Sequence, residues 1–193
     1  MRVAYLHGFA SYYDPENPKV KALEVLAAPY GLDINYYAGP QVAIQSAIYF
    51  CLKHQIDLVV GTSMGGWLAS HVGAALGIPF VALNPARVPA VSLMKYTEVP
   101  EEPQFDHGGY PMPVMEPEVV MSYPPINKKG CGLVIVEKGD EMFDWKATKS
   151  DLDKYHKVVV VDGGSHRFES LRDQLDVIEH FVEMSGIIYG VDS

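Results

Sequence analysis

Short apolar runs alternate along this chain with longer segments of helical periodicity. Six runs are rich in β-branched or aromatic residues and end in turn residues, a pattern typical of strands. The runs LVIV and VVVV are apolar at successive positions, as expected for parallel strands that helices cover on both faces. The pattern therefore predicts an α/β fold with a mostly parallel sheet of about six strands. The expected strands are Val3–Leu6, Ile34–Tyr37, Leu58–Val60, Phe80–Leu83, Leu133–Val136 and Val158–Val161.

Five segments have the apolar spacing of helices that pack on such a sheet. In the last of them, apolar residues recur at spacings of three, four and one, which places them on one face of a helix. Packing alone explains this stripe, so no chemistry is assigned to it. The expected helices are Lys19–Ala28, Val42–His54, Met64–Leu76, Lys146–Tyr155 and Phe168–Met184.

The region from Pro85 to Pro125 interrupts this alternation. It holds nine of the 14 prolines and four of the eight methionines, with several aromatic residues among them. Proline at this density excludes long helices and favours a folded excursion of short elements. The excursion is either a long surface loop or a lid whose methionine and aromatic side chains form an adaptable apolar pocket. The lid is favoured, because long irregular loops in compact domains are usually functional or disordered.

Composition limits the class of protein. A chain of 193 residues with 48% hydrophobic residues is not disordered, and we expect one domain over residues 1–193, with the excursion at about 85–125 supplying the excess over roughly 150 residues. The net charge of −9 argues against nucleic-acid or anionic-membrane partners. Cys51 and Cys131 lack the spacing of a disulfide framework or a zinc site, and the amino terminus does not resemble a signal peptide. These features favour the cytoplasm.

A stretch without any charged residue extends from Leu58 to Ala86. Its length alone would suffice for a membrane span. Five glycine residues and Pro79 interrupt it, however, and Arg87 followed by an acidic stretch is a poor orientation signal. The stretch is better explained as a strand, a helix and a second strand buried together.

The sequence Gly61-Thr62-Ser63-Met64-Gly65 matches G-x-S-x-G between a predicted strand and a predicted helix. In this context the motif is typical of a nucleophilic serine on a tight strand-to-helix turn, where side chains at positions 61 and 65 would collide. A glycine-rich turn without chemistry is the weaker alternative. Ser63 is therefore the candidate nucleophile, and the backbone N–H of Met64 at the helix start is a candidate oxyanion donor.

A serine nucleophile needs a base, and His166 is the best of the seven histidines. It follows the last predicted strand by the short turn DGGS, which places it at the same carboxyl edge of the sheet as Ser63. The other histidines lie in predicted helices, in the excursion, or in the LHGF loop, where His7 is expected to order the backbone. That loop follows the first strand and can supply the backbone N–H of Phe9 as a second oxyanion donor.

Three aspartates could orient the base. Asp140 is preferred because it closely follows a predicted strand in a Gly-Asp turn. Asp144 could instead cap the helix that begins near Lys146, and Asp162 suits backbone hydrogen bonding in its own turn. The preferred order of Ser63, Asp140 and His166 is the order found in α/β-hydrolases.

With these motifs in view, the chain resembles the YqiA-like esterase branch of the α/β-hydrolases. LHGF, GTSMGG, LNPA, KGDEMFDW and DGGSHRF occur in the order of that family, and the match spans nearly the whole chain. The resemblance implies a compact sheet flanked by helices, no metal or organic cofactor, and hydrolysis of carboxylic ester or thioester bonds. It also supports Ser63 as nucleophile, His166 as base and Asp140 as its partner.

The predicted function is thus a serine esterase or thioesterase that acts on a small acyl substrate through an acyl-enzyme. An acyltransferase or peptidase on the same fold is one alternative, and a non-catalytic ligand-binding protein is another. The stretch at residues 36–40 and the excursion depart from the family pattern. Both are expected to form the pocket, so substrate preference is the property that the resemblance transfers least.

Overall fold

A computed structural model describes residues 1–186, and its centre is a six-stranded sheet in the order β2-β1-β3-β4-β5-β6. All neighbouring strands are parallel, which confirms the predicted fold class. β2 pairs with one side of β1, and β3 pairs with the other side. The strands are β1 (Val3–Leu6), β2 (Tyr30–Leu32), β3 (Leu58–Thr62), β4 (Phe80–Leu83), β5 (Gly132–Glu137) and β6 (Lys157–Val161).

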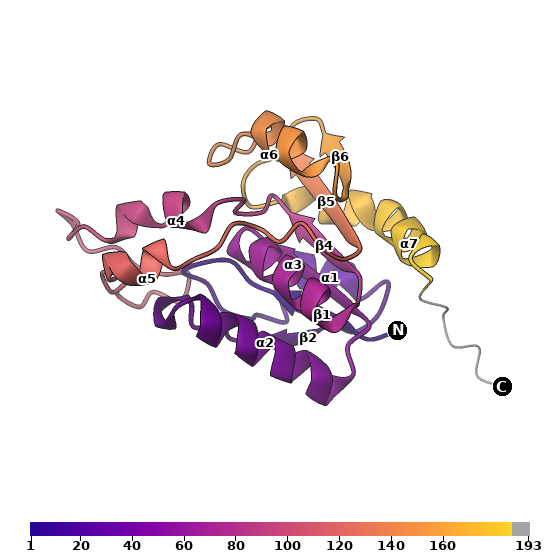
Figure 1. Ribbon diagram of the computed structural model, residues 1–193, viewed down its shortest axis with the longest axis horizontal. Helices are drawn as coiled ribbons and strands as arrows, with labels where there is room; N and C mark the ends of the chain where they lie inside the picture. The colour runs from indigo at the N-terminus through magenta and orange to yellow at the C-terminus, as the bar shows by residue number, and fades with distance from the viewer. Residues whose placement is uncertain (187–193) are drawn as a thin grey trace.

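Helices cover both faces of this sheet (Figure 1). One face packs against α2 (Pro40–His54), α3 (Met64–Leu76) and α6 (Trp145–Leu152), and the other against α1 (Pro18–Leu23) and α7 (Leu175–Met184). In β1, for example, Val3 and Tyr5 enter the core of the second face, whereas Ala4 and Leu6 enter that of the first. Burial on both faces explains why the strands are apolar at successive positions.

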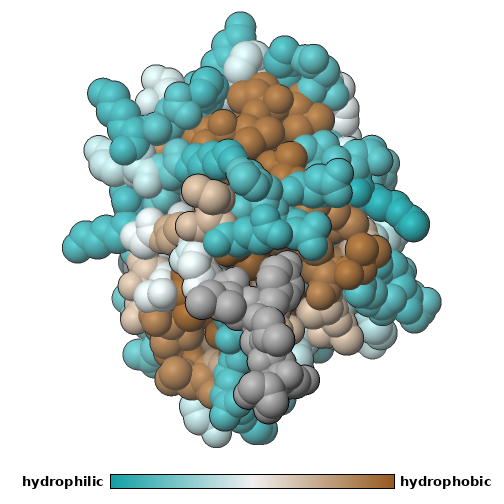
Figure 2. All heavy atoms as spheres, turned by 90° about the vertical axis from the view of Figure 1, so that its right-hand side faces the viewer, coloured by the Kyte–Doolittle hydropathy of each residue, from teal (hydrophilic) through white to brown (hydrophobic). Residues whose placement is uncertain are grey.

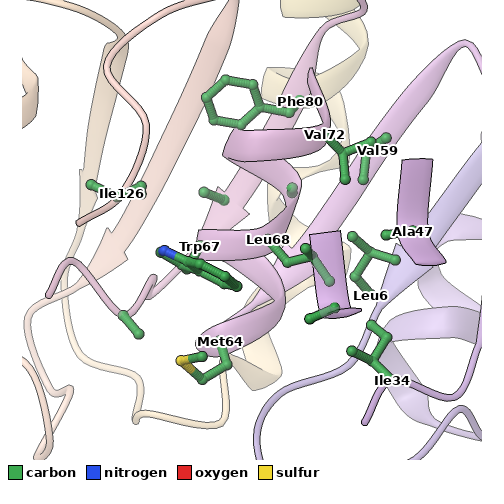
Figure 3. Packing of buried hydrophobic residues seen from close by; sticks show 14 of the residues in the cluster. Leu6, Ile34, Ala47, Val59, Met64, Trp67, Leu68, Val72, Phe80 and Ile126 are labelled. Carbon is green, nitrogen blue, oxygen red and sulfur yellow. The ribbon is translucent and has the colours of Figure 1, made fainter. Parts of the chain in front are cut away.

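The uncharged stretch forms the interior of the molecule. It comprises β3, α3 and β4, and all their strand residues and most residues of α3 are buried. Figure 3 shows α3 beside the sheet, with the side chains of Trp67, Leu68 and Val72 projecting from it. The stretch lacks charge because desolvation of an unpaired charge there would be costly.

The excursion lies to one side of the sheet, at the left of Figure 1. It contains α4 (Pro89–Ser92), a 3-10 helix (Met94–Tyr96), an isolated bridge between Phe105 and Pro111, and α5 (Pro117–Met121). The N–H of His107 donates to the carbonyl of Ala10 at 3.0 Å, so the excursion docks on the loop that follows β1. Its far end is fixed where Trp67 Nε1 donates to the carbonyl of Pro124 at 2.8 Å.

The second strand differs from the prediction. The structure has β2 at Tyr30–Leu32. In the expected strand Ile34–Tyr37, residues 34 and 35 belong to no helix or strand, and Tyr36 and Tyr37 lie in the 3-10 helix Tyr36–Ala38. Asn35 caps this short helix by accepting a hydrogen bond from the N–H of Tyr37 at 3.1 Å. The prediction is wrong here because Tyr36 is buried by tertiary contacts and not by strand pairing. The β-propensity of aromatic residues does not distinguish these two kinds of burial.

Three helices are shorter than predicted, and one of them, α6, ends at Leu152 rather than Tyr155. The first helix, α1, ends at Leu23 rather than Ala28, and a turn over residues 24–26 follows it. The last α-helix begins at Leu175, after a 3-10 helix over Glu169–Gln174, whereas the prediction began at Phe168. Phe168 has φ of 56°, in the left-handed region, and therefore lies outside a right-handed helix.

The surface is mainly polar where α7 and the amino terminus lie. Figure 2 shows this side with hydrophilic side chains over much of it and separate groups of hydrophobic side chains between them. Within residues 1–186, no helix has both the length and the apolar character needed to cross a bilayer.

Trp67→Phe tests the anchor between α3 and the end of the excursion. The variant keeps an aromatic ring in the core but leaves the carbonyl of Pro124 without its donor, so we expect the unfolding free energy to fall by about 1–3 kcal/mol. The matched control is Trp145→Phe, a half-buried residue at the start of α6, for which we expect a loss below about 1 kcal/mol. Urea unfolding measures both free energies, and equal losses of unfolding free energy in the two variants would contradict the role of the Trp67 hydrogen bond as an anchor.

Candidate active site

The carboxyl ends of the central strands bring the predicted site residues to one edge of the sheet. Phe9 follows β1, Ser63 follows β3, Asp140 follows β5 and His166 follows β6. The strand order reverses between β1 and β3, and ligands of open parallel sheets bind outside the carboxyl ends at such a reversal. Ser63 lies at this point.

The turn that carries Ser63 requires glycine on both sides. Ser63 has φ of 58° and ψ of −118°, a strained conformation for a residue with a side chain. A Cβ atom at Gly61 would lie 2.0 Å from the carbonyl oxygen of Gly65, and one at Gly65 would lie 2.0 Å from the carbonyl oxygen of Leu6. The close approach of α3 to β1 and β3 therefore accounts for the G-x-S-x-G spacing.

Ser63, His166 and Asp140 form a continuous hydrogen-bonded chain. His166 Nε2 lies 3.0 Å from Ser63 Oγ, and His166 Nδ1 lies 3.0 and 3.1 Å from the two carboxylate oxygens of Asp140. The side chain of Asp140 is only 2% exposed and that of His166 13% exposed. Water therefore has little access to the hydrogen bond between them.

The structure distinguishes the three candidate acids by their contacts. Asp140 Oδ1 also accepts hydrogen bonds from the N–H groups of Met142 and Phe143, which orient the carboxylate toward the imidazole. Asp144 caps α6 by accepting from the N–H of Lys146 at 2.8 Å. Asp162 is exposed and pairs with Lys138. Only Asp140 of the three contacts His166.

Neighbouring groups fix the imidazole and its backbone. The ring of Phe143 meets the His166 ring edge-on, with centroids 4.8 Å apart. The N–H of His166 donates to Glu141 Oε2 at 2.9 Å, and this hydrogen bond lowers the pKa of Glu141. The carboxylate of Glu141 therefore stays charged and holds the backbone of the histidine.

Buried contacts also order the loop after β1. His7 accepts a hydrogen bond at Nε2 from the N–H of Ile34 and donates from Nδ1 to the carbonyl of Gly8, at 2.9 and 2.8 Å. The hydroxyl of Tyr36 donates to the carbonyl of His7 at 2.7 Å. His7 thus has the structural position that its sequence context predicts.

The N–H groups of Phe9 and Met64 have no hydrogen-bond acceptor among the described residues. Phe9 N–H lies in the ordered loop after β1, and Met64 N–H lies at the first residue of α3. The start of a helix favours negative charge because its N–H groups are unpaired and its dipole is positive there. Both amides are therefore free to donate to a bound anion.

Two hollows meet at Ser63 and His166. One, of about 440 Å³, is bounded on the excursion side mainly by apolar side chains, including Leu93, Tyr96 and Met112. The other, of about 410 Å³, has a more polar wall that includes Lys19 and Glu169. The site is thus an open cleft with an apolar and a polar side.

Asn84 and Glu137 are not among the predicted site residues, although both lie behind His166. Asn84 follows β4 in the LNPA segment, and Glu137 is the acidic last residue of the otherwise apolar strand β5. Both are buried. The sequence signal that could have identified them is a polar residue at the end of an otherwise apolar strand. Among residues 1–186, no three His, Cys, Asp or Glu side chains come together as a metal site would require.

The parallel sheet, the strained serine turn and the hydrogen-bonded chain at the sheet edge define an α/β-hydrolase fold. Comparison with known families agrees. The family model described as "Uncharacterised protein family (UPF0227)" matches residues 2–183, and the chain belongs to this family. This match confirms the predicted resemblance to the YqiA-like branch.

Relatives match over nearly their full length. A UPF0227 protein of Yersinia pseudotuberculosis is 26% identical over 189 residues, which cover 93% of this chain and 97% of that protein. A UPF0227 protein of Yersinia pestis has the same identity and coverage.

Solved structures share the fold at low identity. Est1E from Butyrivibrio proteoclasticus superposes with a TM-score of 0.71 at 15% identity, over 95% of this chain and 87% of that chain. A monoacylglycerol lipase of Paleococcus ferrophilus gives a TM-score of 0.65 at 14% identity, over 94% and 93% of the two chains. These similarities show that the architecture is shared with esterases and lipases.

The hydrogen bonds of His7 predict its protonation state. Burial lowers the pKa of His7 below its usual value near 6.5, and a proton on Nε2 would face the N–H of Ile34. As the pH falls, the unfolded chain therefore takes up a proton at this histidine before the folded chain does. The contribution of neutral His7 to stability is present above about pH 6.5 and is lost as the pH falls through the lowered pKa.

We expect nitrogen-detected NMR to show the Nδ1–H tautomer of His7 at pH 7, with a titration midpoint below 6.5. The unfolding free energy should decrease between pH 7 and pH 5, because burial lowers the pKa values of His71 and His156 as well. A proton on Nε2 at pH 7, or a His7 midpoint above 6.5, would refute this assignment.

Proposed function

We propose that this protein is a serine hydrolase that cleaves carboxylic ester or acyl thioester bonds. Ser63 is the nucleophile, His166 the general base and acid, and Asp140 the residue that orients His166. The N–H groups of Phe9 and Met64 stabilise the oxyanion. The observation that carries the proposal is the chain from Asp140 through His166 to Ser63, beside two amides that have no acceptor within residues 1–186.

The contacts of the imidazole support these roles. Because a buried carboxylate accepts from Nδ1, the neutral imidazole keeps its proton there, and Nε2 presents a lone pair to Ser63 Oγ at 3.0 Å. In the first step Nε2 takes the hydroxyl proton as Oγ bonds to the acyl carbon. The imidazolium then returns the proton to the leaving oxygen or sulfur, and an acyl-enzyme remains.

Water completes the cycle by the same groups. Nε2 takes a proton from a water molecule as its oxygen attacks the acyl carbon, and the proton returns to Ser63 Oγ as the carboxylic acid leaves. In both tetrahedral intermediates the oxyanion is held by the amides of Phe9 and Met64. Fixed donors of this kind supply much of the rate enhancement in acyl transfer.

The walls of the cleft suggest the class of acyl group. The excursion contributes Leu93, Tyr96, Phe105 and Met112 to the hollow of about 440 Å³, so we propose that it covers an uncharged, apolar acyl chain as a lid. Among the structures that share the fold, Est1E has been solved with ferulic acid bound, and another is a monoacylglycerol lipase. Both names fit carboxylic ester chemistry.

Replacement of the nucleophile is the first test. Ser63→Ala should abolish labelling by a fluorophosphonate probe and lower the hydrolysis of p-nitrophenyl butyrate at least about 1000-fold. Ser92→Ala removes another hydroxyl from the same hollow and should leave both signals within about threefold of wild type. Labelling that persists in Ser63→Ala would rule out Ser63 as the nucleophile.

Paired amide substitutions separate the two neighbouring acids. Asp140→Asn should lower kcat about 1000-fold or more, because an amide can stabilise the wrong histidine tautomer. Asp144→Asn should leave kcat nearly unchanged and the thermal midpoint close to wild type, since asparagine caps a helix about as well as aspartate. The opposite result, in steady-state kinetics of folded variants, would exchange the roles of the two residues.

A further inference from the structure

Ser165, the residue before His166, is held on both sides by buried side chains from the sheet. Its N–H donates to Glu137 Oε2 at 3.0 Å, and its carbonyl accepts from Asn84 Nδ2 at 2.9 Å. Asn84 and Glu137 stand at the ends of β4 and β5, and Asn84 Oδ1 accepts from the backbone N–H of Glu137 at 2.8 Å. The two side chains thus form one connected unit, which we call the Ser165 clamp.

The clamp is enclosed. Glu137 is 0% exposed and Asn84 1% exposed. The second carboxylate oxygen of Glu137 accepts from the hydroxyl of Ser170, on the far side of His166 in the sequence. A Cβ atom at Gly164 would lie 2.1 Å from the carboxyl carbon of Glu137, so the histidine loop rests directly on this carboxylate.

Burial of a carboxylate at this place needs an explanation. A charged group out of water is costly unless it is well hydrogen-bonded, and an apolar residue would continue the pattern of β5. The carboxylate of Glu137 makes no hydrogen bond to Ser63, Asp140 or the imidazole among residues 1–186; only the backbone carbonyl of Glu137 accepts from the N–H of Asp140, at 3.2 Å. Its hydrogen bonds instead reach residues on either side of His166, which points to a role in the placement of that loop.

We propose that Glu137 and Asn84 are positioning residues that fix the backbone of Ser165 and thereby hold His166 between Asp140 and Ser63. The inference rests on the proposed function, because it concerns the geometry of the proposed base. The clamp fixes the N–H and the carbonyl of Ser165. Glu141, which is not part of the clamp, fixes the N–H of His166. A displacement of about 1 Å at a reacting group can lower a rate about 100-fold.

Within the clamp, Glu137 acts through its two acceptor oxygens, which allows a conservative rescue at this residue. In Glu137→Gln the amide oxygen can accept from Ser165 N–H, and the amide N–H₂ can donate to the hydroxyl of Ser170. In Glu137→Met a flexible side chain of similar length fills the space but leaves both donors without a partner. The two variants therefore differ in hydrogen bonding at nearly constant shape.

The test compares these variants in hydrolysis of p-nitrophenyl butyrate. We expect Glu137→Met to lower kcat about 10- to 100-fold with KM within about threefold, and Glu137→Gln to stay within about threefold of wild type. Asn84→Ala, which releases the carbonyl of Ser165, should also lower kcat and serves if Glu137→Met does not fold. The matched control is Ser70→Ala in α3, where a buried hydroxyl bonds Trp67 and Asn127; it should lower the thermal midpoint without lowering kcat.

A second measurement does not require turnover. We expect NMR of Glu137→Met to show faster amide exchange at Ser165 and broadening of the His166 Nδ1 proton, with both signals restored in Glu137→Gln. A folded Glu137→Met with wild-type kcat and an unchanged His166 signal would overturn the clamp, as would a Glu137→Gln variant as impaired as Glu137→Met. If wild-type hydrolysis does not depend on Ser63, the proposed function fails instead, and the NMR comparison still decides whether the clamp holds His166.

Discussion

The backbone of α3 approaches β1 and β3 so closely that positions 61 and 65 have no room for a side chain. Cβ atoms there would lie 2.0 Å from carbonyl oxygens of Gly65 and Leu6. This contact forces Ser63 into its left-handed conformation and directs its side chain away from the sheet. It also brings the first N–H of α3 next to the hydroxyl. The positions of the proposed nucleophile and of one proposed oxyanion donor therefore follow from a single packing constraint.

The parallel sheet supplies the remaining groups at the same edge. Ser63 follows β3, and the loops after β1, β4, β5 and β6 converge on this serine. Buried polar contacts then fix each loop: His7 after β1, the Ser165 clamp after β4 and β5, and Asp140 with its two backbone donors. The interior beneath is apolar on both faces, so these polar groups concentrate at the edge where catalysis is proposed.

Much of this arrangement could be predicted from the sequence, because local pattern and chain order determine it. The run from Leu58 to Ala86 gave the central strands and helix, and the turns after the strands placed Ser63, Asp140 and His166 at one edge. Tyr36 was misassigned to a strand because its burial depends on contacts with His7, distant in sequence. Asn84 and Glu137 were missed for the same reason, since their partner Ser165 is known only from the fold. The structure brings the predicted residues together, and their catalytic roles remain proposals.

A crystal structure of the protein after reaction with diethyl p-nitrophenyl phosphate would test the central claim most directly. The account predicts a covalent bond from Ser63 Oγ to phosphorus, with the phosphoryl oxygen about 2.7–3.1 Å from the backbone nitrogens of Phe9 and Met64. His166 Nε2 should lie beside one of the remaining phosphorus oxygens. An adduct on another residue, or a phosphoryl oxygen directed away from both amides, would contradict the account.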